Sequence, residues 1–278
     1  PALRNKAHFC AISSTSGTAT EVTAFSIITD YEKGIKYPIA DFEITPDVAI
    51  VDPDLAETMP KKLVAHTGMD AMTHAIEAYV SVMASDYTDG LALHAIEMVF
   101  TYLEKSYNGD PLAREKMHNA SCIAGMAFTN AFLGLNHSMA HKLGAECHIP
   151  HGRANAILLP YVIKYNATKP TKFASFPKYK EYVADERYAK IARRVGLCSA
   201  DTPISEAVDC LVKAIRELMT VTERPLCIKD CGVSEAEFMS KVDELSYKAF
   251  EDQCTTANPV YPLVSEIKEL YREAYYGE

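Results

Sequence analysis

The 278-residue sequence lacks several features that would assign it to a particular class of protein. It has no excess of basic residues: the formal net charge is -9, which argues against nucleic acid as a main partner because phosphate binding needs a basic surface. It has no run of about 18 apolar residues, as a membrane-spanning helix requires, and no pattern typical of a signal peptide. We therefore expect a cytoplasmic protein without nucleic acid or membrane among its partners.

The eight cysteines form no CxxC pair. They lie mostly within apolar stretches, such as those around Cys122 and Cys210, which is typical of reduced, buried thiols rather than of a disulfide framework or a Cys-type zinc site. The phosphate-binding patterns GxxxxGK[ST] and GxGxxG are also absent. The sequence therefore contains no complete nucleotide-binding fingerprint.

The character of the sequence changes near residues 56–61. Before this point, short β-branched or aromatic runs at 8–15, 24–30 and 47–52 indicate strands. After Pro60, apolar residues recur at helical spacing, as in Met69, Met72, Ile76 and Val80. Further helices are expected at 86–107, 111–132, 134–147, 152–167, 185–195, 203–220, 234–250 and 263–276, with a polar loop at 168–184. The pattern predicts a mainly α protein, in which a small α/β piece precedes a large all-helical domain. Because an apparent strand follows almost directly on the first residues, we expect the chain to be part of a longer protein.

Two groups of residues suggest a site for a divalent metal ion. Asp70 and His74 stand four residues apart in an expected helix, so both side chains project from one face and could bind one ion. The alternative is that Asp70 forms a cap or a salt bridge and that His74 is an ordinary buried or surface histidine. One carboxylate with several imidazoles would suit Zn, Fe(II), Co or Ni.

The second group is a cluster of histidines between residues 137 and 151. His137, His141, His148 and His151 lie among small and apolar residues, which would allow helices to approach closely around a buried site. Spacing alone favours His137 and His141, which repeat the four-residue separation, with His151 third. The alternative is a histidine-lined substrate pocket or a polar network in the core.

A hydroxyl-rich loop at 13–23 follows the first expected strand. Such a loop can offer backbone N–H groups and hydroxyls to a phosphate or a ribose. The structural alternative is a connection from a strand to a helix, capped by Thr18, with Glu21 closing a capping box.

These stretches together resemble the iron-dependent (group III) alcohol dehydrogenases. The similarity is strongest at GMDAMTHAIEAYVS (68–81), GLNHSMAHKLGAECHIPHGRANAILLP (134–160) and SSTSGTATEVTAFSIITD (13–30). The segments KFASFPKYKEY (172–182) and DQCTTANPVYPLVSEIKELYREAYYGE (252–278) look like the C-terminal alcohol dehydrogenase half of the bacterial bifunctional aldehyde-alcohol dehydrogenases.

The resemblance implies a fold of the dehydroquinate synthase-like, iron alcohol dehydrogenase type. Residues 1–60 would be the C-terminal part of an α/β nucleotide-binding domain, and residues 61–278 the all-helical catalytic domain. The implied metal ligands are Asp70, His74, His137 and His151, with Fe(II) as the ion and zinc as the alternative. His141 would lie near the ion without binding it and would handle a proton, in place of the ligand role that spacing suggests.

The resemblance also implies the other partners of the site. Ser14, Thr15, Thr18 and Lys36 would contact NAD, and Phe128 and Phe25 would line the substrate pocket. In this family a glycine-rich nucleotide-binding half precedes the point where this chain begins. The implied activity interconverts short-chain aldehydes such as acetaldehyde and primary alcohols with NAD(H), within a bifunctional enzyme that converts acetyl-CoA to ethanol and forms homo-oligomers or filaments.

Other functions are compatible with the same residues. A metal lyase resembling dehydroquinate synthase and a zinc polyol dehydrogenase would use the same fold with three protein ligands. A helical filament-assembly module would need no metal. A metallohydrolase would need a general base beside the ligands, and the only close candidate, Glu77, is expected to face solvent.

Overall fold

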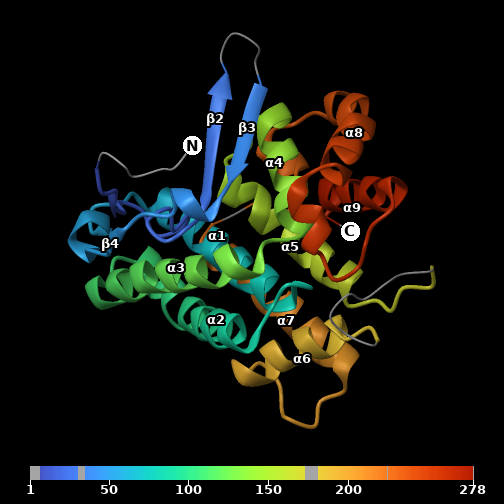
Figure 1. Cartoon of the computed structure of the whole chain (residues 1–278). Helices are drawn as coiled ribbons and strands as arrows, with labels where there is room; N and C mark the ends of the chain where they lie inside the picture. The colour runs from blue at the N-terminus through green and yellow to red at the C-terminus, as the bar shows by residue number, and fades with distance from the viewer. Residues whose placement is uncertain (1–6, 31–34, 173–180, 224, 278) are drawn as a thin grey trace.

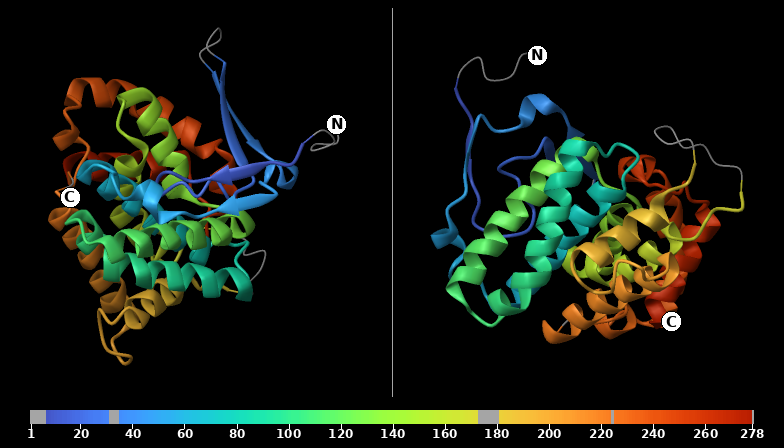
Figure 2. Two further views of the ribbon diagram at one scale, coloured as in Figure 1. Left: turned by 90° about the vertical axis from the view of Figure 1, so that its left-hand side faces the viewer. Right: turned by 90° about the horizontal axis from the view of Figure 1, so that it is seen from below.

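The computed structural model describes residues 7–30, 35–172, 181–223 and 225–277, and helices make up most of it (Figure 1). Its strands are β1 (Cys10–Ile12), β2 (Phe25–Asp30), β3 (Ile35–Ala40) and β4 (Val48–Ile50). β1 and β4 pair in parallel, whereas β2 and β3 form an antiparallel pair that projects from the helices (Figures 1 and 2). The three expected strand regions each hold a strand, and β3 is an addition. Two short 3-10 helices, η1 (Phe42–Ile44) and η2 (Pro53–Ala56), complete this part.

The mainly α fold is confirmed by the helices that follow. They are α1 (Lys61–Val80), α2 (Asp86–Tyr107), α3 (Pro111–Ala131), α4 (Leu135–Cys147), α5 (His151–Asn166), α6 (Ala184–Arg194), α7 (Ile204–Val221), α8 (Glu235–Phe250) and α9 (Val264–Tyr276), with 3-10 helices η3 (Lys229–Cys231) and η4 (Gln253–Ala257). Local signals explain their starts: the Ser85 hydroxyl caps α2, and the Asp110 carboxylate caps α3, whose first residue is Pro111. Among the residues that the structure describes, no helix combines the length and hydrophobicity of a membrane span.

Helix α1 lies in the middle of the fold, packed against α2, α3 and α5. Every residue from 68 to 80 is buried, so this helix has no solvent-exposed face over its second half. A helix surrounded by protein on all sides can direct polar residues inward as well as apolar ones, provided that they find partners. Asp70, His74 and Glu77 are all interior residues for this reason.

The turn between α4 and α5 brings the start of α5 against α1. His148 ends α4 in the left-handed conformation (φ 54°), and α5 begins three residues later. At Gly152, a Cβ atom would lie 2.1 Å from the carbonyl oxygen of His66 on α1. Only glycine allows this approach, which sets how close His151 comes to α1.

The hydroxyl-rich loop forms no helix, so the structural alternative of a helix capped by Thr18 is wrong. The loop instead packs between α1 and α3. A Cβ at Gly17 would lie 2.6 Å from the Thr67 Cβ on α1, and the buried His118 of α3 contacts the hydroxyls of Ser13 (3.2 Å) and Ser16 (3.0 Å). These contacts to two helices replace the local capping that the sequence suggests.

Candidate metal centre

Three of the expected ligands meet between α1, α4 and α5. The Asp70 Oδ1 atom is 3.7 Å from Nε2 of His137 and 3.5 Å from Nε2 of His151. These three atoms all lie within 4.8 Å of one another, a spacing that one metal ion could bridge. Asp70 and His137 are buried, whereas the His151 side chain is 40% exposed, so the cluster reaches the surface on the α5 side.

The amide of Asn155 shows that these three atoms face one small volume. Its Nδ2 atom lies 2.6 Å from Asp70 Oδ1, 3.0 Å from His137 Nε2 and 3.2 Å from His151 Nε2. An amide nitrogen carries two hydrogens and cannot donate to three partners at once. Asn155 Oδ1 accepts a hydrogen bond from Asn136 Nδ2 (3.0 Å), which holds the amide in this place.

His74 lies beside this group without joining it, in a stack of four aromatic rings. The stack consists of Phe25, Phe128, His74 and His137, which come from β2, α3, α1 and α4. Ring centroids are 4.3 Å apart between Phe128 and His74 and 4.6 Å apart between His74 and His137. His74 Nδ1 is buried and has no hydrogen-bond partner among the described residues, so it is a further atom that could bind an ion.

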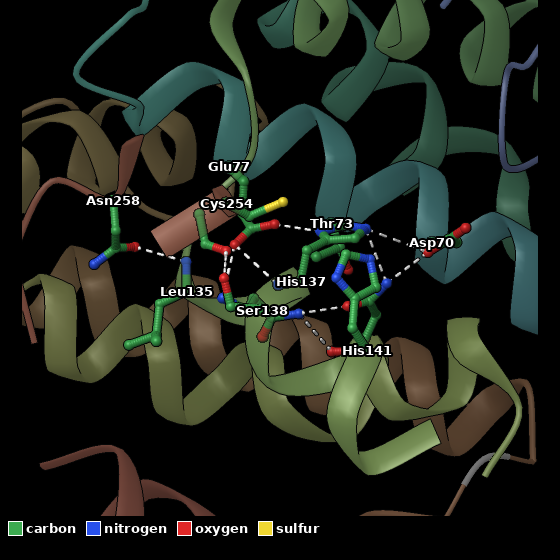
Figure 3. A network of polar contacts seen from close by, with 12 residues as sticks. Asp70, Thr73, Glu77, Leu135, His137, Ser138, His141, Cys254 and Asn258 are labelled. Carbon is green, nitrogen blue, oxygen red and sulfur yellow. Dashed lines mark hydrogen bonds and ion pairs between the residues drawn. The ribbon is translucent and has the colours of Figure 1, made fainter. Parts of the chain in front are cut away.

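Glu77 holds His137 from the side opposite Asp70. Its Oε2 contacts His137 Nδ1, and its Oε1 accepts a hydrogen bond from the Asn136 N–H (2.8 Å) at the start of α4 (Figure 3). Glu77 is buried, so the expectation that it faces solvent is wrong, because α1 is covered on every side. A carboxylate on Nδ1 fixes the ring so that Nε2 is available to a metal ion. Since both oxygens are occupied, Glu77 is also poorly placed to act as a general base for a hydrolase.

The charges of the cluster favour a cation. Burial raises the pKa of Asp70, but His151, His74 and His137 outweigh this effect and hold that pKa well below its usual range. Burial lowers the pKa of His74 to about 3, so this ring is neutral at physiological pH. Burial also lowers the pKa of His137, yet Glu77 and Asp70 outweigh it and raise the pKa to about 9. The two carboxylates therefore stabilise one positive charge at His137, which a metal ion can supply in place of a proton.

His141 pairs with Asp252 and not with Asp70. It lies one turn after His137 on α4, its Nδ1 is 3.2 Å from Asp252 Oδ2, and its ring stacks on that of His151 with centroids 5.4 Å apart. The structure thus brings His151, rather than His141, to Asp70 and His137. The remaining member of the histidine cluster, His148, is the exposed residue that ends α4.

Three of the four residues expected at the coenzyme lie on the hydroxyl-rich loop. Ser14 and Thr18 are exposed and Thr15 is half-buried, whereas Ser13 and Ser16 point inward to His118. Lys36 lies in β3, and its side chain is outside the residues whose side chains the structure describes.

Comparisons with known proteins identify the family. Residues 64–275 match the family model described as "Fe-containing alcohol dehydrogenase family, C-terminal", and residues 1–53 match that of "Iron-containing alcohol dehydrogenase". The chain belongs to the iron-containing alcohol dehydrogenase family. The resemblance inferred from the sequence motifs is therefore confirmed.

Individual members of the iron-containing alcohol dehydrogenase family cover nearly the whole chain. It is 54% identical over 276 residues to aldehyde-alcohol dehydrogenase 2 of Entamoeba histolytica, covering 99% of this chain and 32% of that protein. It is 56% identical over 277 residues to the NADPH-dependent butanol dehydrogenase of Clostridium saccharobutylicum, covering 100% of this chain and 67% of that protein. The structure of the iron-containing alcohol dehydrogenase from Thermococcus thioreducens superimposes with a TM-score of 0.87 at 40% identity, over 100% of this chain and 67% of that one. The chain spans about a third of the length of the aldehyde-alcohol dehydrogenases it matches.

Sequence reasoning missed three polar residues in or beside this site. Asn155 stands four residues after His151 on α5, so its place on the same helix face could be inferred from the spacing. Glu77 carries a similar signal, since it follows His74 by three residues, but the sequence alone favours a position facing solvent. Asp252 is 111 residues from His141, and no local pattern connects the two.

Proposed function

We propose that this chain is the metal-binding catalytic part of an alcohol dehydrogenase that interconverts short-chain aldehydes, such as acetaldehyde, and primary alcohols with NAD(H). The observation that carries the proposal is the convergence of Asp70 Oδ1 with Nε2 of His137 and Nε2 of His151. The membership of the chain in the iron-containing family supports iron as the ion. Zinc remains the alternative, since imidazole and carboxylate ligands suit both metals.

Asp70, His74, His137 and His151 are the proposed ligands. The fit rests on the donor atoms themselves: three face one volume at Asn155 Nδ2, and the buried His74 Nδ1 has no partner within the described part of the chain. A divalent ion held there would act as a Lewis acid that polarises the substrate oxygen. Glu77 would keep the His137 ring turned toward it.

His141 is the proposed proton-handling residue. Its ring lies beside that of His151, its side chain is 26% exposed, and imidazole exchanges protons near neutral pH. It can therefore pass a proton between solvent and a substrate oxygen next to His151 without itself being a ligand. The coenzyme would supply or accept the hydride.

The aromatic stack is the proposed boundary of the substrate pocket. Phe128 covers the His74 ring and is itself covered by Phe25, which lies half-buried on β2. Apolar rings next to the metal ligands would exclude water and accept a short alkyl chain. Ser14, Thr15 and Thr18 of the hydroxyl-rich loop and Lys36 of β3 would contact NAD.

That the chain is part of a longer protein is also a proposal. Residues 1–60 would complete a nucleotide-binding domain supplied by preceding sequence, and residues 61–278 would form the catalytic domain. The aldehyde-alcohol dehydrogenases that the chain resembles support a bifunctional parent that converts acetyl-CoA to ethanol. Assembly into homo-oligomers or filaments and a cytoplasmic location stay predictions.

Metal content tests the proposal directly. The chain is loaded anaerobically with Fe²⁺, desalted and analysed for iron, as wild type and as the Asp70→Ala, His74→Ala and His141→Ala variants. We expect one iron per wild-type chain, strong loss in Asp70→Ala and His74→Ala, and full retention in His141→Ala. In the enzyme that carries this chain with its nucleotide-binding part, all three variants should lower NADH-dependent reduction of acetaldehyde.

Matched substitutions on helix surfaces serve as controls. His94→Ala on α2 and Asp209→Ala on α7 replace exposed residues of the same types and should retain both iron and activity. Loss of iron from His141→Ala would show that the ligand set is wrong. A wild-type enzyme that holds iron but does not oxidise NADH with any short-chain aldehyde would contradict the proposed reaction.

A further inference from the structure

Asp252 lies beside the candidate metal centre without belonging to it. Its Oδ2 is 3.2 Å from His141 Nδ1 and 2.7 Å from Lys142 Nζ, while its Oδ1 accepts a hydrogen bond from the Cys254 N–H (3.0 Å) and faces the Ser138 hydroxyl at 3.5 Å. The Asp252 side chain is 8% exposed. A buried carboxylate with this many donors is held in one orientation.

We propose that Asp252 is a positioning residue that fixes the ring orientation and the tautomer of His141; this inference rests on the function proposed above for His141. An ionised carboxylate can only accept hydrogen bonds, so the Nδ1 atom that faces it must carry a hydrogen. Nε2 is then the ring nitrogen that exchanges a proton with the substrate side. A carboxylate that orients a catalytic imidazole in this way is a common arrangement.

The groups around His141 agree with this assignment. Its ring stacks on His151 and meets His137 edge-on, so rotation of the ring away from Asp252 would disturb both contacts. Burial raises the pKa of Asp252, but His141 and Lys142 outweigh it and hold that pKa well below its usual range. The carboxylate is therefore ionised throughout the pH range in which His141 would work.

A second metal site is the competing interpretation of the same residues. His141, Asp252 and Cys254 each offer a ligand atom, and these atoms lie within 4.8 Å of one another. However, the Lys142 ammonium occupies Asp252 Oδ2, and burial raises the pKa of the Cys254 thiol well above its usual value. A cation would meet a like charge and a protonated thiol, so the hydrogen-bonded arrangement is favoured.

Two substitutions separate the positioning of His141 from the capping of η4. Asp252 caps η4 through the Cys254 N–H, and asparagine and serine are both good caps. Asp252→Asn and Asp252→Ser therefore keep the local fold but remove the charge that faces His141. Asp209→Asn, on the exposed side of α7, is the matched control.

The first readout is the tautomer of His141, measured by NMR on the metal-free chain labelled with ¹⁵N-histidine. The His141 signals are those that disappear in His141→Gln. We expect neutral His141 to carry its hydrogen on Nδ1 in the wild type and in Asp209→Asn, and to shift toward the Nε2 tautomer or a mixture in Asp252→Asn and Asp252→Ser. An unchanged Nδ1 tautomer in both Asp252 variants would overturn the proposal.

The second readout is a double-mutant cycle in the enzyme that carries this chain with its nucleotide-binding part. Each Asp252 variant should lower kcat for acetaldehyde by about 10- to 100-fold, with a smaller change in KM and iron content unchanged. In the His141→Ala background the same substitutions should change kcat less than about twofold, because the residue through which they act is gone. Equal losses in both backgrounds, or a second bound ion that Asp252→Asn removes, would overturn the proposal. An inactive wild-type enzyme would instead refute the proposed function, and the NMR result would still stand.

Discussion

The contact between Glu77 and His137 yields a prediction about stability as well as metal binding. In the metal-free chain, a pKa of about 9 for His137, against 6.5 for a free histidine, corresponds to about 3 kcal/mol of stability. Because this pKa is raised by folding, the contribution is nearly complete below about pH 6.5 and is lost as the pH rises through about 9. Glu77→Gln removes the largest favourable contribution to that pKa while keeping an amide oxygen for the Asn136 N–H.

We expect Glu77→Gln to lower the free energy of unfolding of the metal-free chain by about 3 kcal/mol near pH 6 and by less than about 0.5 kcal/mol near pH 9.5. Urea unfolding followed by circular dichroism at the two pH values measures this difference. Glu104→Gln, exposed on α2, is the control and should change stability little at either pH. A loss that is equal at the two pH values would refute the reasoning, since it would mean that Glu77 acts through packing and not through the charge on His137.

The same substitution tests the orientation of the ligand. The side-chain NH2 of glutamine would face His137 Nδ1 as a donor, which favours the tautomer whose hydrogen is on Nε2. That tautomer cannot bind a metal ion through Nε2, so the affinity for Fe²⁺ or Zn²⁺ should fall by about 10- to 100-fold. Titration with Zn²⁺ in competition with a chelator measures the change, and an affinity equal to that of the wild type would show that Glu77 does not orient the ligand.

Two further predictions follow from close contacts around the site. Gly152→Ala places a Cβ 2.1 Å from the His66 carbonyl oxygen, so it should destabilise the chain by about 1–3 kcal/mol in thermal melts and weaken metal binding. In the control Gly90→Ala, the added Cβ meets no atom within 4 Å, so this substitution should stabilise the chain by about 0.5–1 kcal/mol. Equal effects of the two would mean that α5 can move away from α1 without cost. Burial lowers the pKa of His118, although Glu21 and Asp52 oppose it, so folding favours its neutral form and wild-type stability should fall as the pH drops below about 6.5. His118→Gln should make this fall of stability with pH shallower in urea unfolding, whereas the surface control His94→Gln should not. Equal slopes in the two variants would contradict the prediction.

Local sequence patterns predicted most of the secondary structure. The helices after α1 begin and end within about one residue of their expected bounds, because caps such as Ser85 and Asp110 and residues such as Pro111 act through neighbours in the chain. The loop at 13–23 shows the limit of this reasoning. Its Thr18 and Glu21 resemble a capping box, but contacts with α1 and α3 keep the segment irregular.

The histidine cluster shows the same limit within the site. Four-residue spacing places His137 and His141 on similar faces of α4, and on spacing alone they are equivalent. The structure distinguishes them by their partners: Glu77 and Asp70 lie on either side of His137, whereas His141 contacts Asp252. The partners that distinguish the two rings come from distant parts of the chain, so no local pattern contains them.

The amino-acid sequence by itself determined that this protein is mainly helical, that Asp70 and His74 share one helix face, and that several histidines lie close enough in the chain to join them. Only the tertiary structure decided which histidines do so, through the left-handed turn at His148 and the close approach of Gly152 to α1. It also decided that Glu77 is an interior partner of His137. The physical reason is that helical spacing states on which side of its own helix a residue lies, whereas the function of that residue depends on what is packed against that side.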